Sequence, residues 1–300
     1  MSIEEFVESV REEVERQTGK EVRIHEVTKN NGVVLHGINI IEPGINITPT
    51  IYIEPFKEYF ENGRRLEEIA EHICEICRRD KLSSSVSMEW FRDFEQVKDK
   101  VAYKLVNYEA NKELLEKVPY EKILDLAKVY YVSVNMREVG DGTILIYNTH
   151  LDLWGITAEQ LGEIAEENTP KMFPVKTHWM GDILDDIYGD SYDEELAEEL
   201  EELKKQCSMY VMTNQQKVFG AATMCYPDTV KYYAEQMDSD IHIIPSSLHE
   251  IIMVPKALGG DLDRLKELVY EVNRTQVEKE EMLSDSVYIY RRETDSIEIA

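Results

Sequence analysis

One short stretch, Ser246-Ser247-Leu248-His249-Glu250, brings a hydroxyl, an imidazole and a carboxylate together. A hydrolase nucleophile needs a base within hydrogen-bonding reach and a third group that orients this base. The stretch lacks the Gly-x-Ser-x-Gly elbow of α/β-hydrolases and lies between two apolar runs of strand length. We therefore expect Ser246 and His249 to bond to the backbone of a hairpin turn. A hydrolase centred on Ser246, Ser247, His249 and Glu250 is the alternative.

Cys74 and Cys77 form a Cys-x-x-C pair, a spacing found in zinc and redox sites. A structural zinc needs four ligands, but no second pair exists because Cys207 and Cys225 are isolated in the sequence. Both cysteines of the pair also fall on the apolar face of a predicted helix, where a free cysteine packs as a small hydrophobe. We expect core packing, with a metal or redox role for Cys74 and Cys77 as the alternative, and we expect no cofactor.

The charge balance is strongly acidic, with 60 Asp and Glu against 33 Lys and Arg and a net charge of −27. Nucleic-acid affinity comes largely from Lys and Arg that neutralise phosphates, so direct nucleic-acid binding is not expected. The charge instead favours a basic protein partner, or mimicry of nucleic acid as an alternative. The residues predicted to meet such a partner lie on one acidic segment: Glu194, Glu195, Glu198, Glu199, Glu201 and Glu202.

Several features predict a cytoplasmic protein that does not bind membranes. The 300 residues contain no apolar run of the roughly 18 residues that a membrane span requires. The first residues form an acidic amphipathic pattern, unlike a signal or transit peptide. Four cysteines without a secretion signal indicate free thiols in a reducing compartment. The oligomeric state does not follow from these features.

Residues 1–85 are predicted to form an α-β-β-β-α unit. A capping box of Ser2 and Glu5 begins the first helix, and Gly19 ends it. Strands follow at 22–28 and 33–41, joined by the hairpin signal Asn30-Asn31-Gly32, and a third is expected at 45–53. The second helix buries a stripe formed by Leu66, Ile69, Ala70, Ile73 and Cys77. The serine-rich residues 82–85 are predicted as a linker.

The C-terminal part, residues 207–300, shows a β-α-β-β-α-β order, typical of a ferredoxin-like unit with split βαβ connections. Strands are expected at 218–225, 241–244, 251–254 and 286–291. A helix is expected after Pro227, because proline is accepted in a first helical turn. The other helix follows Gly259-Gly260 and carries an apolar stripe at Leu262, Leu265, Leu268, Val269 and Val272.

The middle part, residues 101–169, has a looser version of the same pattern. Strands are expected at 101–106, 127–135 and 143–148, with helices at 111–118 and after the capping pair Thr157 and Gln160. We interpret the middle and C-terminal parts as two ferredoxin-like units from a diverged duplication. Between them, residues 170–206 are predicted as a proline-bearing loop that becomes an acidic helix. The chain as a whole is thus predicted to be α+β.

Long phrases along the chain carry a family resemblance. They include KLVNYEANKELLEKVPYEKILDLAKVYYVSV, YNTHLDLWGITAEQLGEIAEENTP, FGAATMCYPDTVKYYAEQM, IPSSLHEIIMVP and VNRTQVEKEEMLSDSVYIY. Together they resemble the uncharacterised bacterial family known as domain of unknown function 5688. A weaker likeness, in LWGITAEQLGEIAEENT and LSDSVYIY, extends to domain of unknown function 1444. The resemblance implies a bacterial, intracellular protein and transfers no catalytic motif.

Three functions are compatible with these patterns. The first is a non-enzymatic interaction or regulatory protein that offers an acidic surface to a protein partner. Its motivation is a clear fold signal without a catalytic constellation. The second is a hydrolase of unrecognised type at the Ser246–Glu250 stretch, and the third is an acidic mimic of nucleic acid. A concave pocket with convergent polar groups would favour the enzyme, and carboxylates spaced like phosphates would favour the mimic.

Overall fold

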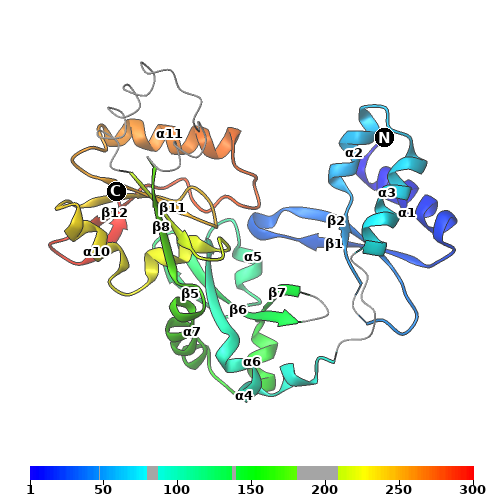
Figure 1. Ribbon diagram of the computed structural model, residues 1–300, viewed down its shortest axis with the longest axis horizontal. Helices are drawn as coiled ribbons and strands as arrows, with labels where there is room; N and C mark the ends of the chain where they lie inside the picture. Colours follow the sequence, from blue (N-terminus) through cyan, green and yellow to red (C-terminus); the bar gives the residue numbers. More distant parts are fainter. Residues whose placement is uncertain (47, 80–86, 137–139, 181–208) are drawn as a thin grey trace, which may run out of the picture. The chain divides into compact units, whose positions relative to one another are not determined.

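The computed structural model describes residues 1–46, 48–79, 87–136, 140–180 and 209–300 (Figure 1). Within these ranges helices combine with antiparallel sheets, which confirms the predicted α+β class. The chain divides into two compact units. One comprises Met1–Arg92 with Val134–Gly142, and the other comprises Asp93–Ser133 with Thr143–Ala300. In the described ranges, no helix has the length and apolarity needed to cross a bilayer.

The first unit opens with helix α1 (Ile3–Thr18), which begins and ends as its sequence predicts. The Ser2 hydroxyl accepts a hydrogen bond from the Glu5 N–H at 3.2 Å, and the Glu5 carboxylate accepts one from the Ser2 N–H at 2.9 Å. Gly19 ends the helix at φ 65°, a left-handed conformation that glycine adopts without a steric cost. Phe6, Val7, Val10 and Val14 are buried along one face.

The predicted hairpin forms between β1 (Val22–Thr28) and β2 (Val34–Ile40), and a short strand β3 (Ile51–Tyr52) completes an antiparallel sheet in the order β1-β2-β3. Helix α2 (Glu54–Glu61), which was not predicted, follows at once and has a proline in its first turn. Helix α3 (Leu66–Arg79) then contacts α1. The unit therefore has the order α-β-β-β-α-α.

The third strand expected at 45–53 is wrong for most of its length, because only Ile51 and Tyr52 pair with β2. The side-chain amide of Asn39 donates hydrogen bonds to the carbonyls of Thr48 at 3.3 Å and Pro49 at 2.7 Å. These carbonyls are thus held by a side chain instead of a strand ladder, and Pro49 has no N–H to offer. The isoleucines that suggested a strand belong to a loop between β2 and β3.

A sheet of four strands, most of whose residues belong to the second unit, has β6 (Leu126–Met136) paired to β4 (Val101–Asn107), β5 (Tyr120–Ile123) and β7 (Gly140–Leu145). The helices of this region are α4 (Phe94–Val97), α5 (Lys112–Leu115), α6 (Asn148–Trp154) and α7 (Ala158–Met172). The helix predicted at 111–118 is one turn, and β5 was missed. Because β4 and β5 are both antiparallel to β6, they form a parallel pair split by one strand, as in a split βαβ unit. The fourth strand, β7, pairs with β6 and not with β4, so the ferredoxin-like strand order is not completed.

The second sheet of this unit has six antiparallel strands in the order β13-β12-β10-β11-β9-β8. Its strands are β8 (Val175–Trp179), β9 (Tyr210–Asn214), β10 (Ile241–Ile244), β11 (Ile251–Pro255), β12 (Tyr288–Arg291) and β13 (Ser296–Ile299). The helices α10 (Thr229–Gln236) and α11 (Leu262–Thr275) connect them. The predicted pairing of residues 241–244 with 251–254 is confirmed, and Ile243 lies opposite Met253.

This sheet does not show the ferredoxin-like strand order that the sequence suggested. A ferredoxin-like sheet places its fourth strand beside its first, whereas β12 lies beside β10, the second strand of the motif. Both β9 to β10 and β11 to β12 remain parallel pairs split by one strand. With right-handed crossovers, this order puts α10 and α11 on opposite faces of the sheet. Figure 1 shows α11 along the top of the strands and α10 to their left, near the C-terminus. The first three strands of the two regions share one order, since β4-β6-β5 corresponds to β9-β11-β10, and the fourth strands differ, because β7 pairs with β6 and β12 with β10. The duplication stays a prediction.

The strand predicted at 218–225 is wrong, because Gly220–Cys225 forms a 3-10 helix and the strand β9 lies upstream of it. Lys217 and Phe219 adopt left-handed φ angles of 57° and 52°, which interrupt any extended run. A Cβ at Gly220 would lie 2.2 Å from Oγ1 of Thr213, so only glycine fits there. Gly220–Met224 are buried in this 3-10 turn, whereas Val218 at the start of the run is exposed.

The segment 170–206 also differs from its prediction at its start. Helix α7 continues through Pro170 to Met172, and β8 then joins the edge of the six-stranded sheet beside β9. The acidic helix expected at 192–206, with its apolar residues Tyr192, Leu196, Leu200 and Leu203, lies outside the described residues, as does the linker predicted at 82–85.

Candidate functional site

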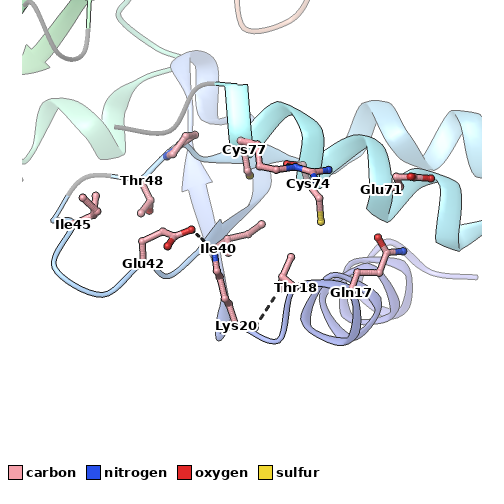
Figure 2. A pocket seen from close by; sticks show the side chains of 12 residues that line it. Gln17, Thr18, Lys20, Ile40, Glu42, Ile45, Thr48, Glu71, Cys74 and Cys77 are labelled. Atoms are coloured by element: carbon pink, nitrogen blue, oxygen red, sulfur yellow. Dashed lines mark hydrogen bonds and ion pairs between the residues drawn. The ribbon is translucent and has the colours of Figure 1, made fainter. Parts of the chain in front are cut away.

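A cavity of ≈ 480 Å³ opens in the first unit, at the C-terminal ends of α1 and α3 and beside the loop after β2 (Figure 2). This volume lies within the range of about 300–1,000 Å³ that is typical of small-molecule sites. The lining residues come from all three segments: Gln17, Thr18, Lys20, Ile40, Glu42, Ile45, Thr48, Pro49, Glu71, Cys74, Cys77 and Arg78. Residues that are distant in the sequence thus share one concave surface.

The two cysteines of the Cys-x-x-C pair form part of the cavity wall. They lie three residues apart on α3, a spacing that puts both on one helix face. Cys74 is 6% exposed and Cys77 is 8% exposed, and both also belong to the hydrophobic core of the unit. Figure 2 shows the sulfur of Cys74 turned toward the open space between Thr18 and Lys20. The pair therefore both packs the core and faces a cavity.

Charged and polar groups form the rim. The ammonium of Lys20 contacts the carboxylate of Glu42, which comes from the loop after β2. The Thr18 hydroxyl donates to the Val14 carbonyl at 2.7 Å and accepts from the Lys20 N–H at 3.3 Å. Arg78 Nε donates to the Cys74 carbonyl at 3.1 Å. The rim can therefore orient a polar group, while Ile40 and the thiols offer apolar contact.

The reactive group on this wall, the thiol of Cys74, is neutral. Burial raises the pKa of Cys74, and the charges of Arg78 and Lys20 act in the opposite direction with less effect. A thiol with a raised pKa is a poor nucleophile and a poor metal ligand at neutral pH, because both roles need the thiolate. The described residues also contain no group of three or more His, Cys, Asp or Glu that could hold a metal ion. The cavity therefore suits binding more than catalysis.

The Ser246–Glu250 stretch forms the turn between β10 and β11. The Ser246 hydroxyl donates to Glu250, 3.3 Å from both the backbone carbonyl and Oε1. The Ser247 hydroxyl accepts the His249 N–H at 3.0 Å. Neither hydroxyl is bonded to the His249 ring, so the structure does not bring the serine and imidazole together as nucleophile and base.

The His249 ring is engaged elsewhere. Its Nδ1 accepts the backbone N–H of Phe219 at 3.1 Å, so in the neutral ring Nε2 carries the proton. Nε2 faces Oε1 of Glu281 at 3.7 Å. The ring also stacks on Phe219, with ring centroids 5.8 Å apart and planes 13° from parallel. A tautomer fixed in this way has no lone pair available to act as a base toward Ser246 or Ser247.

A second titratable cluster, which sequence reasoning missed, lies inside the second unit. Lys128 on β6 is 6% exposed, contacts Glu166 of α7 and lies 4.9 Å from the ring centroid of Tyr103. Burial raises the pKa of Cys225 nearby to about 12. The carboxylate of Glu166 compensates the charge of the buried Lys128 ammonium. We therefore interpret this cluster as an ion pair of the core and not as a separate functional site.

The glutamates predicted to meet a partner lie outside the described residues: Glu194, Glu195, Glu198, Glu199, Glu201 and Glu202. The cavity was missed because its rim residues Lys20, Glu42 and Arg78 carry no motif. The one sequence signal in this region is the Cys-x-x-C pair, whose spacing is also found in zinc sites. The residue pattern of one segment does not show which other segment it packs against. The loop after β2 and its contact with a helix therefore could not be predicted.

Fold and site together define an α+β protein with a ligand-sized cavity in its N-terminal unit and no catalytic constellation among the described residues. The chain belongs to the family described as "Family of unknown function (DUF5688)", which matches residues 3–292. The resemblance that the sequence phrases suggested is thereby confirmed. No curated protein and no solved structure matches the chain.

Proposed function

We propose that this protein is a non-enzymatic binding protein with a regulatory role, and that its N-terminal cavity takes up a small amphipathic molecule. The observation that carries the proposal is the ≈ 480 Å³ cavity, which has apolar walls and a charged rim. Sites for small molecules are concave and mostly apolar, with a few polar groups that fix orientation. The rim formed by Lys20, Glu42 and Arg78 supplies such groups.

Two observations favour binding over catalysis. The raised pKa of Cys74 keeps its thiol neutral, and the fixed tautomer of His249 removes the base that the hydrolase alternative requires. A hydrolase at Ser246 would need the imidazole to turn away from Phe219 and give up both the stacking contact and the hydrogen bond. The alternative therefore has the weaker support.

The partner surface is a further part of the proposal. A net charge of −27 favours a basic protein partner over nucleic acid, and the acidic segment around Glu194–Glu202 is the proposed contact. In this scheme the ligand occupies the cavity, and a cytoplasmic partner meets the acidic surface. Charge complementarity of this kind steers association more than it sets affinity.

The cavity is tested with N-phenyl-1-naphthylamine, a neutral dye whose fluorescence rises in apolar sites. We expect the intact protein to bind the dye and Cys74→Leu to weaken binding about tenfold, because the longer side chain extends into the cavity. Ile73→Val is the matched control, since Ile73 lies on the same helix, is fully buried and does not line the cavity. Failure of the intact protein to bind the dye would contradict the proposal.

A further inference from the structure

This inference rests on the proposed function. We infer that the cavity ligand is an aliphatic carboxylate, with the carboxylate held by the Arg78 guanidinium and the hydrocarbon chain lying against Ile40, Cys74 and Ile45. The inference names a substrate class for a cavity that has apolar walls and two cationic side chains at its rim. It follows from the hydrogen-bonding capacity of Arg78, from the balance of charges and from the walls.

Arg78 has donor groups to spare. Within the part of the chain that the structure describes, its Nε donates to the Cys74 carbonyl at 3.1 Å, and its two terminal nitrogens make no hydrogen bond or ion pair. Other arginines of this acidic chain meet carboxylates, such as Arg274 with Asp285 at 2.8 Å. A guanidinium presents a planar fork that matches the two oxygens of a carboxylate. Arg78 is exposed, so an anion in the cavity would take the place of water on this fork.

The rim carries two cationic side chains, Lys20 and Arg78, and two anionic ones, Glu42 and Glu71. Glu42 is paired with Lys20, so its charge is compensated. Glu71, Arg78 and Lys20 are all exposed, so water screens the three charges alike. Among the described residues, Glu71 has no cationic partner as close as that of Glu42. The C-terminal ends of α1 and α3 favour cations, but this effect is weaker than a bidentate pair between guanidinium and carboxylate. Arg78 and Lys20 line the cavity together with Cys74. Their charges act on the Cys74 thiol, and the carboxylates of Glu13 and Glu71 act on it in the opposite direction.

The walls suit a hydrocarbon chain. Ile40 and Cys74 are buried in the hydrophobic core, and the neutral thiol behaves as an apolar surface. Figure 2 shows Ile40 and Cys74 on either side of the open space, with Lys20 near its mouth. A molecule with one charged end and one apolar end therefore matches the two halves of the site.

The test compares octanoate with octanamide, its neutral analogue of nearly equal shape, by titration calorimetry on the full chain. We expect octanoate to bind about tenfold more tightly than octanamide. Arg78→Gln should weaken octanoate binding about tenfold and leave octanamide unchanged, and Arg78→Lys should restore part of the loss. Arg79→Gln is the control, because it removes the same charge from the next residue, which does not line the cavity.

Equal binding of octanoate and octanamide to the intact protein would overturn the inference, as would a loss of both ligands in Arg78→Gln. In either case binding of the neutral dye would leave the proposed function standing. Failure of the dye and both ligands to bind would remove the two together.

Discussion

The hydroxyl of Tyr288 donates a 2.7 Å hydrogen bond to the carboxylate of Asp125, which lies 163 residues earlier in the chain. The same carboxylate accepts hydrogen bonds from Ser284 at 2.7 Å and Ser286 at 2.9 Å. Asp125 follows β5 at the turn into β6, so three hydroxyls tie the first residue of β12 and the segment before it to this turn. The phrase LSDSVYIY, which carried part of the family resemblance, thus has a structural role.

This network predicts a large loss of stability in Asp125→Ala. Three buried or half-buried hydroxyls would lose a charged acceptor, and we expect the free energy of unfolding to fall by about 3 kcal/mol. Tyr288→Phe should cost about 1 kcal/mol. Urea unfolding of both variants and of the double variant measures the coupling. Strictly additive losses would mean that the hydrogen bond between the two residues contributes nothing.

Gly220 is predicted to tolerate no side chain. A Cβ there would lie 2.2 Å from Oγ1 of Thr213 and 2.4 Å from the carbonyl oxygen of His249, which is backbone. Gly220→Ala should lower the free energy of unfolding by about 1–3 kcal/mol, the usual range for overpacking. Gly142→Ala is the control, because its Cβ would meet Val134 at an ordinary 3.4 Å. Equal stability of the two variants in thermal unfolding would contradict the packing described.

His242 on β10 should make the fold sensitive to acid. Burial lowers the pKa of this histidine, with smaller contributions from Lys256 and Arg291, and its Nδ1 has no hydrogen-bond partner. A lowered folded-state pKa means that protonation favours the unfolded chain. The stability is therefore present above the unfolded value near 6.5 and is lost as pH falls toward the folded value. Unfolding of His242→Gln should depend less on pH than that of wild type over this window; an identical dependence would argue against His242 as the cause.

Zinc should be absent in stoichiometric amount from the purified protein. Burial keeps the Cys74 thiol protonated, and the described residues offer no third ligand beside Cys74 and Cys77. Elemental analysis of wild type and Cys74→Ser checks this. About one zinc per chain, lost in the variant, would show that the pair binds metal after all.

Local signals in the sequence predicted a good part of the fold. The capping box at Ser2, the glycine at position 19 and the hairpin at Asn30–Gly32 each act within a few residues, so their outcomes could be derived without tertiary structure. The position of β12 could not, because whether β12 pairs with β9 or with β10 depends on which faces of the sheet α10 and α11 cover. The same limit explains the wrong strand prediction at 218–225, where apolar residues are buried in a 3-10 turn and not in a sheet.

The site was less predictable than the fold. Cys74 and Cys77 were correctly placed on a buried helix face, but no motif connects Lys20 or Arg78 with them. The cavity exists because the loop after β2 is not a strand, and that outcome depends on the side chain of Asn39 bonding to Thr48 and Pro49. A long-range side-chain contact of this kind leaves no periodic trace.

The central claim is that a small molecule occupies the cavity beside Cys74 and Cys77. The most direct measurement is the rate at which iodoacetamide alkylates each cysteine, followed by mass spectrometry with and without saturating N-phenyl-1-naphthylamine. We predict that the bound dye slows alkylation of Cys74 and Cys77 at least several-fold and leaves Cys225, in the second unit, unchanged. Equal rates at Cys74 and Cys77 with and without the dye would contradict the claim.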